Sequence, residues 1–440
     1  MRMLFAAKVP MKIVGADIIR PVKIKIIFTQ YDGHWIPHFA VQNGRADDIR
    51  PYNVMANNSS NIYPERKREM KKRITLALIC VLMALVLVFA GCAKNEAPTE
   101  PTTEPTTEAT EPTTEAPTEA PTEEPTEAPT EPAGPINPLT GETVEEELTN
   151  RFFCVSINNV KPALPHRSVV DADLYFEMFI NDYATRGLAM YADIENVGSI
   201  GSIRSLRYNF TDIAQGYDAI VAHAGGSESV MSDLKASGVK NLNGNNMGGF
   251  YRDTGRRAAG YSLEHTLFAY GKDLLAEANK RGYRTTLDTE KDFGLDFTAD
   301  GTPANGETAS KVNINFILKG HSKSTTMVYD KDLGGYVYQQ YGMTMKDDST
   351  GVKECFENVI VIVTLVENKV ASGNTYHVAD IEGSGSGYFA CGGKLISINW
   401  KRSGPNAPFS FTLADGTPLE LGVGSSYIAI APTTSQISWE

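Results

Sequence analysis

The chain has 440 residues and a formal net charge of −12 at neutral pH, and its composition changes sharply along its length. Eleven glutamates lie between residues 96 and 131, residues 1–94 carry a net charge of +9, and all other residues together carry −10 with no basic stripe. This acidic balance argues against a nucleic-acid partner. The roughly 300 residues after position 136 have ordinary globular composition and are enough for two domains.

Residues 1–69 alternate short apolar runs with scattered His, Trp and Asn, and they have no sustained helical or strand periodicity. We therefore expect this segment to be disordered. A secretory signal follows it, although such a signal normally starts a protein. We predict that Met70 is the natural start and that residues 1–69 are an upstream extension created by a wrong gene start.

Residues 70–91 have the three parts of a secretory signal. Three basic residues at positions 71–73 precede an apolar run over residues 74–90, and small residues then precede Cys92. The end of the run resembles the bacterial lipobox, where a peptidase cuts before a cysteine that carries a diacylglycerol, although Phe89 stands where leucine is usual. An uncleaved transmembrane helix is the alternative, because the apolar run is close to the length that spans a bilayer.

The lipobox interpretation places the protein on a membrane surface. A cysteine that carries lipid holds a protein to the membrane without spanning it. We expect Cys92 to anchor the chain to the outer face of the cytoplasmic membrane of a Gram-positive bacterium.

Residues 92–136 form an acidic tether built from Pro-Thr-Glu repeats. The repeats hold no large apolar residue, so they cannot bury a core. Regular prolines favour polyproline II and like charges extend the chain, which gives a reach on the order of 100 Å. The tether is either a stalk that lifts the globular part through a thick cell wall or a passive linker, and both interpretations stay open.

The globular part has an α+β pattern. We predict an N-terminal mixed α/β domain over residues 137–295, in which Ser227 caps one helix and Gly282 ends another. Its strands and helices are expected at residues 152–157, 174–180, 187–193 and 217–223, and at residues 208–215, 228–237 and 272–281, respectively.

A second, C-terminal domain is predicted over residues 305–440, because residues 290–310 are rich in Gly, Asp and Thr and look like a boundary. Nearly everything beyond them favours strands in a mainly antiparallel sheet or barrel, and Gly392-Gly393 is a strong hairpin signal. The strands are expected at residues 312–318, 335–341, 359–366, 388–391, 394–400, 409–413 and 427–431.

Three cysteines lie in the globular part, namely Cys154, Cys355 and Cys391. Their odd number and the absence of C-x-x-C spacing argue against a disulfide framework and exclude zinc ribbons and fingers. One bridge with one free thiol stays open.

The globular sequence resembles the YerB-like bacterial lipoproteins over residues 135–440. The resemblance implies a lipoprotein with an N-terminal and a C-terminal domain of unknown function, and it implies no activity. Where many relatives have Pro-His after the Phe-Tyr-Arg-Asp run, this chain has Glu264-His265-Thr266. The motifs that carry the resemblance lie at residues 137–141, 156–159, 172–177, 200–207, 217–227, 358–361, 393–394, 400–401 and 415–416.

A strand, a Gly-Gly-Ser turn and a helix together suggest a site for an anionic ligand. Backbone N–H groups at such a turn and the helix dipole favour an anion. Arg204 and Arg207 are spaced one helical turn apart and would clamp a phosphate or carboxylate, and His223 would reach the same crevice. The residues predicted for this site are Arg204, Arg207, His223, Gly225, Gly226, Ser227, His265 and Glu177.

A structural interpretation of the same residues is also open. The glycines would then only permit a tight turn, Ser227 would only cap a helix, and the arginines would pair with acidic residues such as Glu177.

Enzymatic chemistry is the rival interpretation. Ser227 with His223 or His265, and Asp218 or Glu264, would make a catalytic triad, but the chain lacks the G-x-S-x-G motif. A metal site from the two histidines and a carboxylate has no H-x-x-x-H spacing to support it. We predict no cofactor and no metal.

The leading hypothesis is therefore a non-enzymatic, membrane-anchored lipoprotein that binds an anionic cell-envelope ligand or an envelope protein partner. The alternatives are a hydrolase or transferase that acts on cell-wall or lipid-linked substrates, and a purely structural interaction module. An enzyme would bring the predicted residues into one concave pocket, whereas a module would expose an apolar patch. The sequence gives no indication of the oligomeric state.

Overall fold

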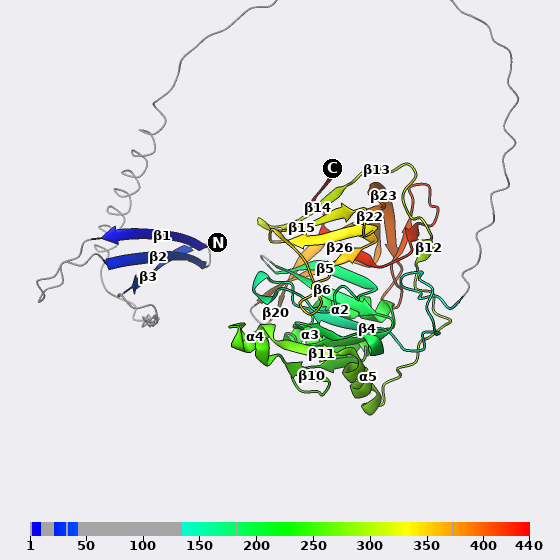
Figure 1. Cartoon of the computed structure of the whole chain (residues 1–440), viewed down its shortest axis with the longest axis horizontal. Helices are drawn as coiled ribbons and strands as arrows, with labels where there is room; N and C mark the ends of the chain where they lie inside the picture. The colour runs from blue at the N-terminus through cyan, green and yellow to red at the C-terminus, as the bar shows by residue number, and fades with distance from the viewer. Residues whose placement is uncertain (1, 10–21, 32–33, 43–133, 182–183, 372–373) are drawn as a thin grey trace, which may run out of the picture. The chain divides into compact units, whose positions relative to one another are not determined.

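The computed structural model describes residues 2–9, 22–31, 34–42, 134–181, 184–371 and 374–440. The chain divides into two compact units, residues 1–120 and residues 121–440. In the first unit, β1 (Arg2–Val9), β2 (Val22–Tyr31) and β3 (His34–Gln42) form an antiparallel sheet in that order (Figure 1). The expectation of disorder over residues 1–69 was therefore wrong for these strands, since apolar and lysine residues alternate at the start of β2 in the manner of a strand.

The signal segment and most of the tether, including Cys92, lie outside the described residues. The start at Met70, the lipid on Cys92 and the extended tether therefore stay predictions. Within the part of the chain that the structure describes, no helix is long and apolar enough to cross a membrane.

The second unit contains an eleven-stranded mixed sheet. Both halves of the globular sequence contribute to it, namely the first half up to residue 295 and the second half from residue 296. The path of the sheet is β13-β23-β22-β19-β26-β5-β6-β4-β8-β9, with β24 paired to β23. The first half supplies β4 (Phe153–Ile157), β5 (Leu174–Asn181), β6 (Ala184–Tyr191), β8 (Ile220–His223) and β9 (Asn241–Asn243). The second half supplies β13 (Glu307–Thr308), β19 (Asn358–Thr364), β22 (Gly383–Cys391), β23 (Lys394–Arg402), β24 (Ser410–Thr412) and β26 (Ser426–Pro432).

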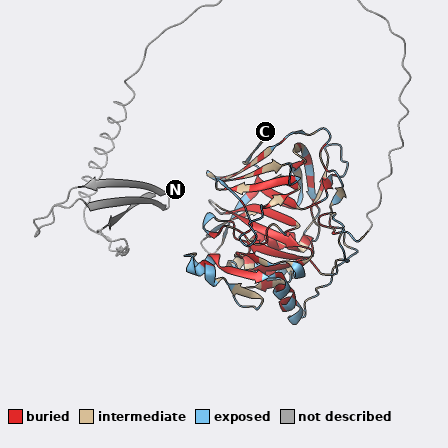
Figure 2. Cartoon of the chain, in the orientation of Figure 1, coloured by how far each residue is buried: buried red, intermediate tan, exposed pale blue. Residues whose placement is uncertain are grey.

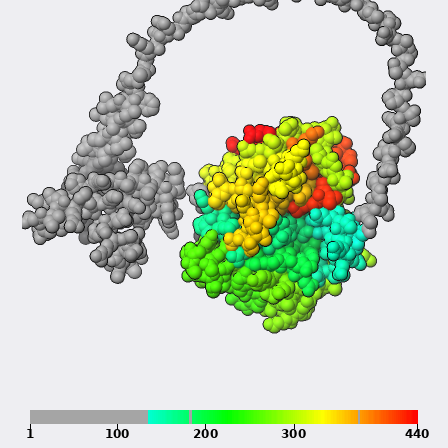
Figure 3. Space-filling view, in the orientation of Figure 1, coloured from blue at the N-terminus to red at the C-terminus, as the bar shows by residue number. Residues whose placement is uncertain are grey.

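The two halves join at the parallel pair β5–β26, whose register runs from Leu174 opposite Ser426 to Met178 opposite Ile430. Parallel pairing in the middle of a sheet suits strands that are apolar on both faces, and β26 is buried along its whole length. The two segments predicted as domains, residues 137–295 and 305–440, both contribute strands to this sheet and lie in one compact unit. Figure 3 shows residues of both halves packed into one body.

A second sheet of six strands covers one face of the mixed sheet. It is antiparallel, with β17-β16-β15-β14-β27 in order and β18 paired to β16, and its strands contact β6, β19 and β26 of the larger sheet. This layer is antiparallel, as we predicted for the C-terminal segment, but the same segment also supplies β19 and β26, which pair in parallel within the larger sheet. The strands are β14 (Lys311–Leu318), β15 (His321–Asp330), β16 (Gly335–Gln340), β17 (Met343–Thr344), β18 (Cys355–Phe356) and β27 (Gln436–Trp439).

The α-helices among the described residues lie in the first half of the globular part. They are α2 (Tyr208–Gly216), α3 (Glu228–Ser237), α4 (Thr254–Ala258) and α5 (Gly271–Lys280). The 3₁₀ turns are η1 (Lys161–Ala163), η2 (Ile194–Asn196) and η3 (Leu263–His265). A small sheet has the order β10-β11-β7, from β7 (Ser199–Gly201), β10 (Phe250–Arg252) and β11 (Leu267–Tyr270). Two further pairs join β12 (Asp296–Thr298) to β25 (Glu420–Gly422), and β20 (Val366–Ala371) to β21 (Asn374–Ala379).

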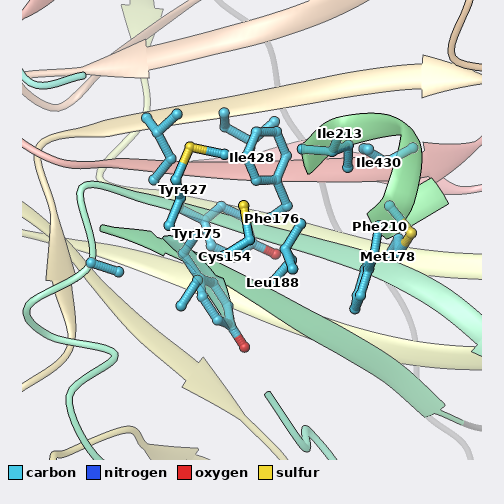
Figure 4. Close-up of a cluster of buried hydrophobic side chains, with 14 of the residues drawn as sticks. Cys154, Tyr175, Phe176, Met178, Leu188, Phe210, Ile213, Tyr427, Ile428 and Ile430 are labelled. Carbon is cyan, nitrogen blue, oxygen red and sulfur yellow. The ribbon is translucent and has the colours of Figure 1, made fainter. Parts of the chain in front are cut away.

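The core runs through both halves of this unit (Figure 2). Figure 4 shows Phe176 and Leu188 of the first half beside Ile428 of the second. Cys154, Cys355 and Cys391 are free thiols, so the one bridge left open from the sequence is not formed.

The predicted Gly-Gly hairpin is confirmed. Gly392 and Gly393 have φ values of +58° and +79°, and they connect β22 to β23. A two-residue turn of this kind needs positive φ at both positions, which glycine adopts without strain.

Candidate functional site

A cleft of about 520 Å³ lies beside the turn that the sequence pointed to. The loop before α2, the turn after β8, the strand β10 and the turn η3 meet there. Three of the predicted site residues line it, namely Arg204, Gly225 and Gly226. The full lining is Ile203, Arg204, Ser205, Ala224, Gly225, Gly226, Asn245, Arg252, Ser262, Leu263 and Glu264.

The Gly-Gly-Ser turn connects the carboxyl end of β8 to α3. Gly225 adopts φ +68°, and its N–H donates to Asn243 Oδ1 at 2.9 Å. Ser227 Oγ accepts a hydrogen bond from the backbone N–H of Val230 at 3.4 Å, so the predicted N-cap is confirmed. Gly225 and Gly226, which directly precede the N-cap of α3, line the cleft. The Ser227 hydroxyl itself caps the helix.

We expect Ser227→Ala to lower the free energy of unfolding by about 1 kcal/mol, because loss of the hydroxyl leaves the backbone N–H of Val230 without its acceptor. Thermal unfolding monitored by circular dichroism measures this. Ser232→Ala is the matched control, since Ser232 is exposed inside the same helix. A Ser227→Ala protein as stable as the control protein would show that the cap contributes nothing.

Two arginines reach the cleft from different elements. Arg204 Nη2 forms an ion pair with Glu264 Oε2 at 2.5 Å, and its side chain is 30% exposed. Arg252 Nη1 donates to the Leu263 carbonyl oxygen at 2.6 Å. Partial burial, and then the positive charge of Arg204, lower the pKa of Arg252. Both guanidinium groups thus contact the turn η3, Arg204 through the Glu264 carboxylate and Arg252 through the Leu263 carbonyl oxygen.

Arg207 does not join this pair. Residues 202–207 are not helical, so Arg204 and Arg207 do not lie one helical turn apart, and Arg207 is the residue before α2. Its Nη1 donates to the carbonyl oxygen of Leu206 at 2.9 Å. Burial lowers the pKa of Arg207 to about 10. The predicted pairing of Arg204 with Arg207 is therefore absent, and Arg252 is the second arginine that lines the cleft.

Arg186 of β6 lies behind the cleft, and the sequence analysis did not identify it. Its Nη1 donates to the carbonyl oxygen of Ser205 at 2.7 Å, and Arg207 Nη1 lies 3.4 Å from the same oxygen. Burial, and then the charges of Arg207 and Arg204, lower the pKa of Arg186 well below its usual range. No sequence motif signals this arginine, because it lies on a buried strand among apolar residues.

The two histidines have structural contacts. His223 is buried, with Nδ1 2.8 Å from the Gly225 carbonyl oxygen and Nε2 3.2 Å from Asn241 Oδ1. His265 Nδ1 lies 2.9 Å from Asn158 Nδ2. Burial lowers the pKa of both rings, which favours their neutral forms near neutral pH. Neither histidine lines the cleft.

Glu177 lies away from the arginines. Its carboxylate is fully buried between the two sheets and forms an ion pair with Lys323. The carboxylate that pairs with Arg204 is Glu264. The structural interpretation of the arginines thus holds for Arg204, although with a different acidic residue than the sequence suggested.

The residues of the hypothetical triad have separate contacts. Ser227 Oγ lies 3.2 Å from Ser229 Oγ, and Asp218 forms ion pairs with Arg151 and Arg284. These partners fix each side chain in a role that serves the fold. Across the described residues, no group of three or more His, Cys, Asp or Glu side chains is placed to hold a metal ion.

Comparisons with known proteins match both halves of the globular part. The family models for the N-terminal and C-terminal domains of a protein of unknown function (DUF3048) match residues 139–284 and 312–428. The chain is 27% identical over 299 residues to "Putative lipoprotein YerB" of Bacillus subtilis (strain 168), which covers 67% of this chain and 86% of that protein. A crystal structure of YerB protein from Bacillus subtilis matches with a TM-score of 0.60 at 23% identity, over 69% of this chain and 99% of that chain. The structural match shows that this chain and that crystal structure share a fold.

Proposed function

Since the chain belongs to the DUF3048 family and carries both of its domains in order, we propose that it is a membrane-anchored extracytoplasmic lipoprotein that binds an anionic group of the cell envelope. The similarity to a protein named a lipoprotein and the signal ending at Cys92 support the membrane location. The cleft beside α3 is the binding site, and Arg204 and Arg252 are the residues that contact the ligand.

The observation that carries this proposal is an excess of positive charge around the cleft. Four guanidinium groups lie in it or directly behind it, and of the four, only Arg204 forms an ion pair among the described residues. The chain as a whole is acidic, so this cluster stands out from the rest of the protein. The four are Arg186, Arg204, Arg207 and Arg252.

Buried charges without counter-charges are costly for a folded protein. Arg186 is almost completely buried, and its Nε is left without a hydrogen-bond partner. An anion in the cleft would supply negative charge that Glu264 provides only in part. The bidentate geometry of guanidinium groups and the N-terminal end of α3 suit a phosphate or a carboxylate.

We expect Arg204→Gln/Arg252→Gln to weaken binding of inorganic pyrophosphate by about tenfold or more, because two charge-assisted hydrogen bonds contribute well over 1.4 kcal/mol together. Titration calorimetry at low salt measures the affinity, and raised salt should weaken it in the wild-type protein.

Arg257→Gln is the matched control for this test. Arg257 is an exposed arginine on α4 and does not line the cleft, so its substitution removes one positive charge and leaves the site unchanged. Binding should survive in that variant. Equal affinity of the wild-type and double-variant proteins for pyrophosphate, or no binding by the wild-type protein, would contradict the proposal.

A further inference from the structure

A buried polar cluster lies between the two sheets, far from any role in the cleft. Its centre is the Glu177 carboxylate on β5, and Lys323 on β15 and Asn159 after β4 both contact it. The side chains of Glu177 and Lys323 are 0% and 1% exposed, and Asn159 is 0% exposed. An amine, a carboxylate and a carboxamide therefore meet in a space that is closed to bulk water.

The amine and the carboxamide share one oxygen atom. Glu177 Oε1 accepts hydrogen bonds from Lys323 Nζ and from Asn159 Nδ2, the latter at 3.0 Å. Two nitrogens that bond to the same oxygen lie within about 6 Å of each other. The Lys323 amine and the Asn159 carboxamide are therefore neighbours around one carboxylate oxygen.

The surroundings favour reaction between these groups. Lys323 Nζ lies over the rings of Phe316, Tyr338 and Tyr341, at 5.7–5.8 Å from their centroids. Burial in this environment lowers the pKa of the Lys323 amine, although the Glu177 carboxylate opposes this shift, and the lower pKa makes loss of a proton from the ammonium less costly. On the acceptor side, Gln340 Nε2 donates to Asn159 Oδ1 at 2.6 Å and so polarises the carbonyl group.

We propose that Lys323 and Asn159 form an intramolecular amide bond with each other, promoted by Glu177. The Lys323 ammonium gives a proton to Glu177, and the neutral Nζ attacks Cγ of Asn159. Negative charge develops on Oδ1, which faces the Gln340 amide. Glu177 then passes its proton to Nδ2, the Cγ–Nδ2 bond breaks, and nitrogen leaves as an ammonium ion with the remaining amine proton. The reaction needs no oxidant, reductant or other reactant.

Such a bond would act as a covalent staple between the two halves of the unit. Asn159 belongs to the segment matched by the N-terminal family model, and Lys323 to the segment matched by the C-terminal model. The bond would close a loop of roughly 160 residues, and cross-links that close long loops restrict the unfolded chain most. The three described cysteines are free thiols, so they provide no equivalent link.

Peptide mass spectrometry of the full-length wild-type protein tests the proposal. After denaturation and digestion, we expect the peptide that contains Asn159 joined to the peptide that contains Lys323, with a combined mass lower by about 17 Da for the lost ammonia. Lys323→Arg should abolish the joined peptide. Lys331→Arg, which changes an exposed lysine just beyond β15, should retain it.

The wild-type digest decides the matter even if Lys323→Arg fails to fold. Recovery of the two peptides separately, each with its unmodified mass, would overturn the proposal. A joined peptide in which fragmentation places the bond on Gln340 instead of Asn159 would overturn it as well. None of these results depends on whether the arginine cleft binds an anion.

Discussion

Replacing Glu177 by alanine is expected to lower the free energy of unfolding by about 3–5 kcal/mol, because the change leaves the Lys323 amine buried without its counter-charge. Burial alone would raise the pKa of Glu177, but the Lys323 ammonium and the hydrogen bonds from Lys323, Thr185 and Tyr427 together lower it, which favours the charged carboxylate in the folded protein. The hydroxyl groups of Tyr338 and Tyr427 also donate to this carboxylate, at 3.0 and 2.6 Å, and would lose their acceptor.

Equilibrium unfolding in urea, followed by circular dichroism, measures this loss. Glu367→Ala is the matched control, since Glu367 is exposed on β20 and its removal should change little. This figure applies to the protein with a free Lys323 amine, in which the ion pair with Glu177 is intact. In a cross-linked protein Glu177→Ala would instead remove the bond between Asn159 and Lys323, and mass spectrometry distinguishes the two cases.

A double variant separates the ion pair from mere disruption of packing. Glu177→Leu/Lys323→Met removes both charges and should recover part of the stability that either single change loses, since an apolar pair leaves no charge uncompensated. A Glu177→Ala protein within 1 kcal/mol of wild type would show that the buried pair contributes little, on the scale of an exposed ion pair.

Local sequence signals predicted much of this fold. Helix α3 has the predicted bounds, residues 228–237, because a capping serine precedes it and a glycine follows it. The alternation of apolar and polar residues in β14 and the Gly-Gly turn before β23 also led to correct predictions. Each of these features depends on residues close together in the chain, where periodicity and turn chemistry are informative.

Strand β15 was missed because its inward positions are not a simple apolar series. Lys323 and Thr325 occupy buried positions, so the first six residues of the strand, 321–326, look polar. The partner that makes this acceptable is Glu177, 146 residues away along the chain. A single sequence carries no signal for such a distant pair, and for this reason Glu177 was placed with the arginines.

The cleft was predicted in part for the same reason. The Gly-Gly-Ser turn marked its position, and Arg204 was identified correctly as a lining residue. Arg252 comes from an edge strand in a different part of the chain, and the spacing of Arg204 and Arg207 suggested a helix that the structure replaces with an extended loop. Which arginine faces the cleft depends on the local backbone, and spacing alone misassigned it.

Replacing Phe153 by alanine is expected to lower the free energy of unfolding by about 3–5 kcal/mol. A probe on a distant strand of the large sheet should detect this loss. Phe153 is completely buried on β4. Trp400, buried on β23, is a natural fluorescent probe six strand positions away along the sheet path. At about 4.8 Å per strand, the two residues lie on the order of 29 Å apart, so Trp400 does not contact the substitution.

The expected result follows from the parallel pairing of β5 with β26, through which the two halves share one sheet and one core. If residues 121–440 unfold as a single cooperative unit, Phe153→Ala lowers the denaturant midpoint of Trp400 fluorescence as much as that of circular dichroism. A Trp35→Phe/Trp439→Phe background leaves Trp400 as the one tryptophan of the sequence, so the fluorescence reports on β23. Val370→Ala, at a side chain that is 73% exposed, controls for truncation of an apolar residue.

Separate transitions would contradict this view of the fold. A Trp400 midpoint that stays at its wild-type value while circular dichroism shows an earlier loss would mean that the two family domains unfold independently despite their shared sheet. Parallel shifts in both signals would instead mean that β26 and β5 couple the halves energetically. A covalent bond between Asn159 and Lys323 would strengthen that coupling, and so Lys323→Arg should separate the two transitions if the strand pairing alone is too weak to hold them together.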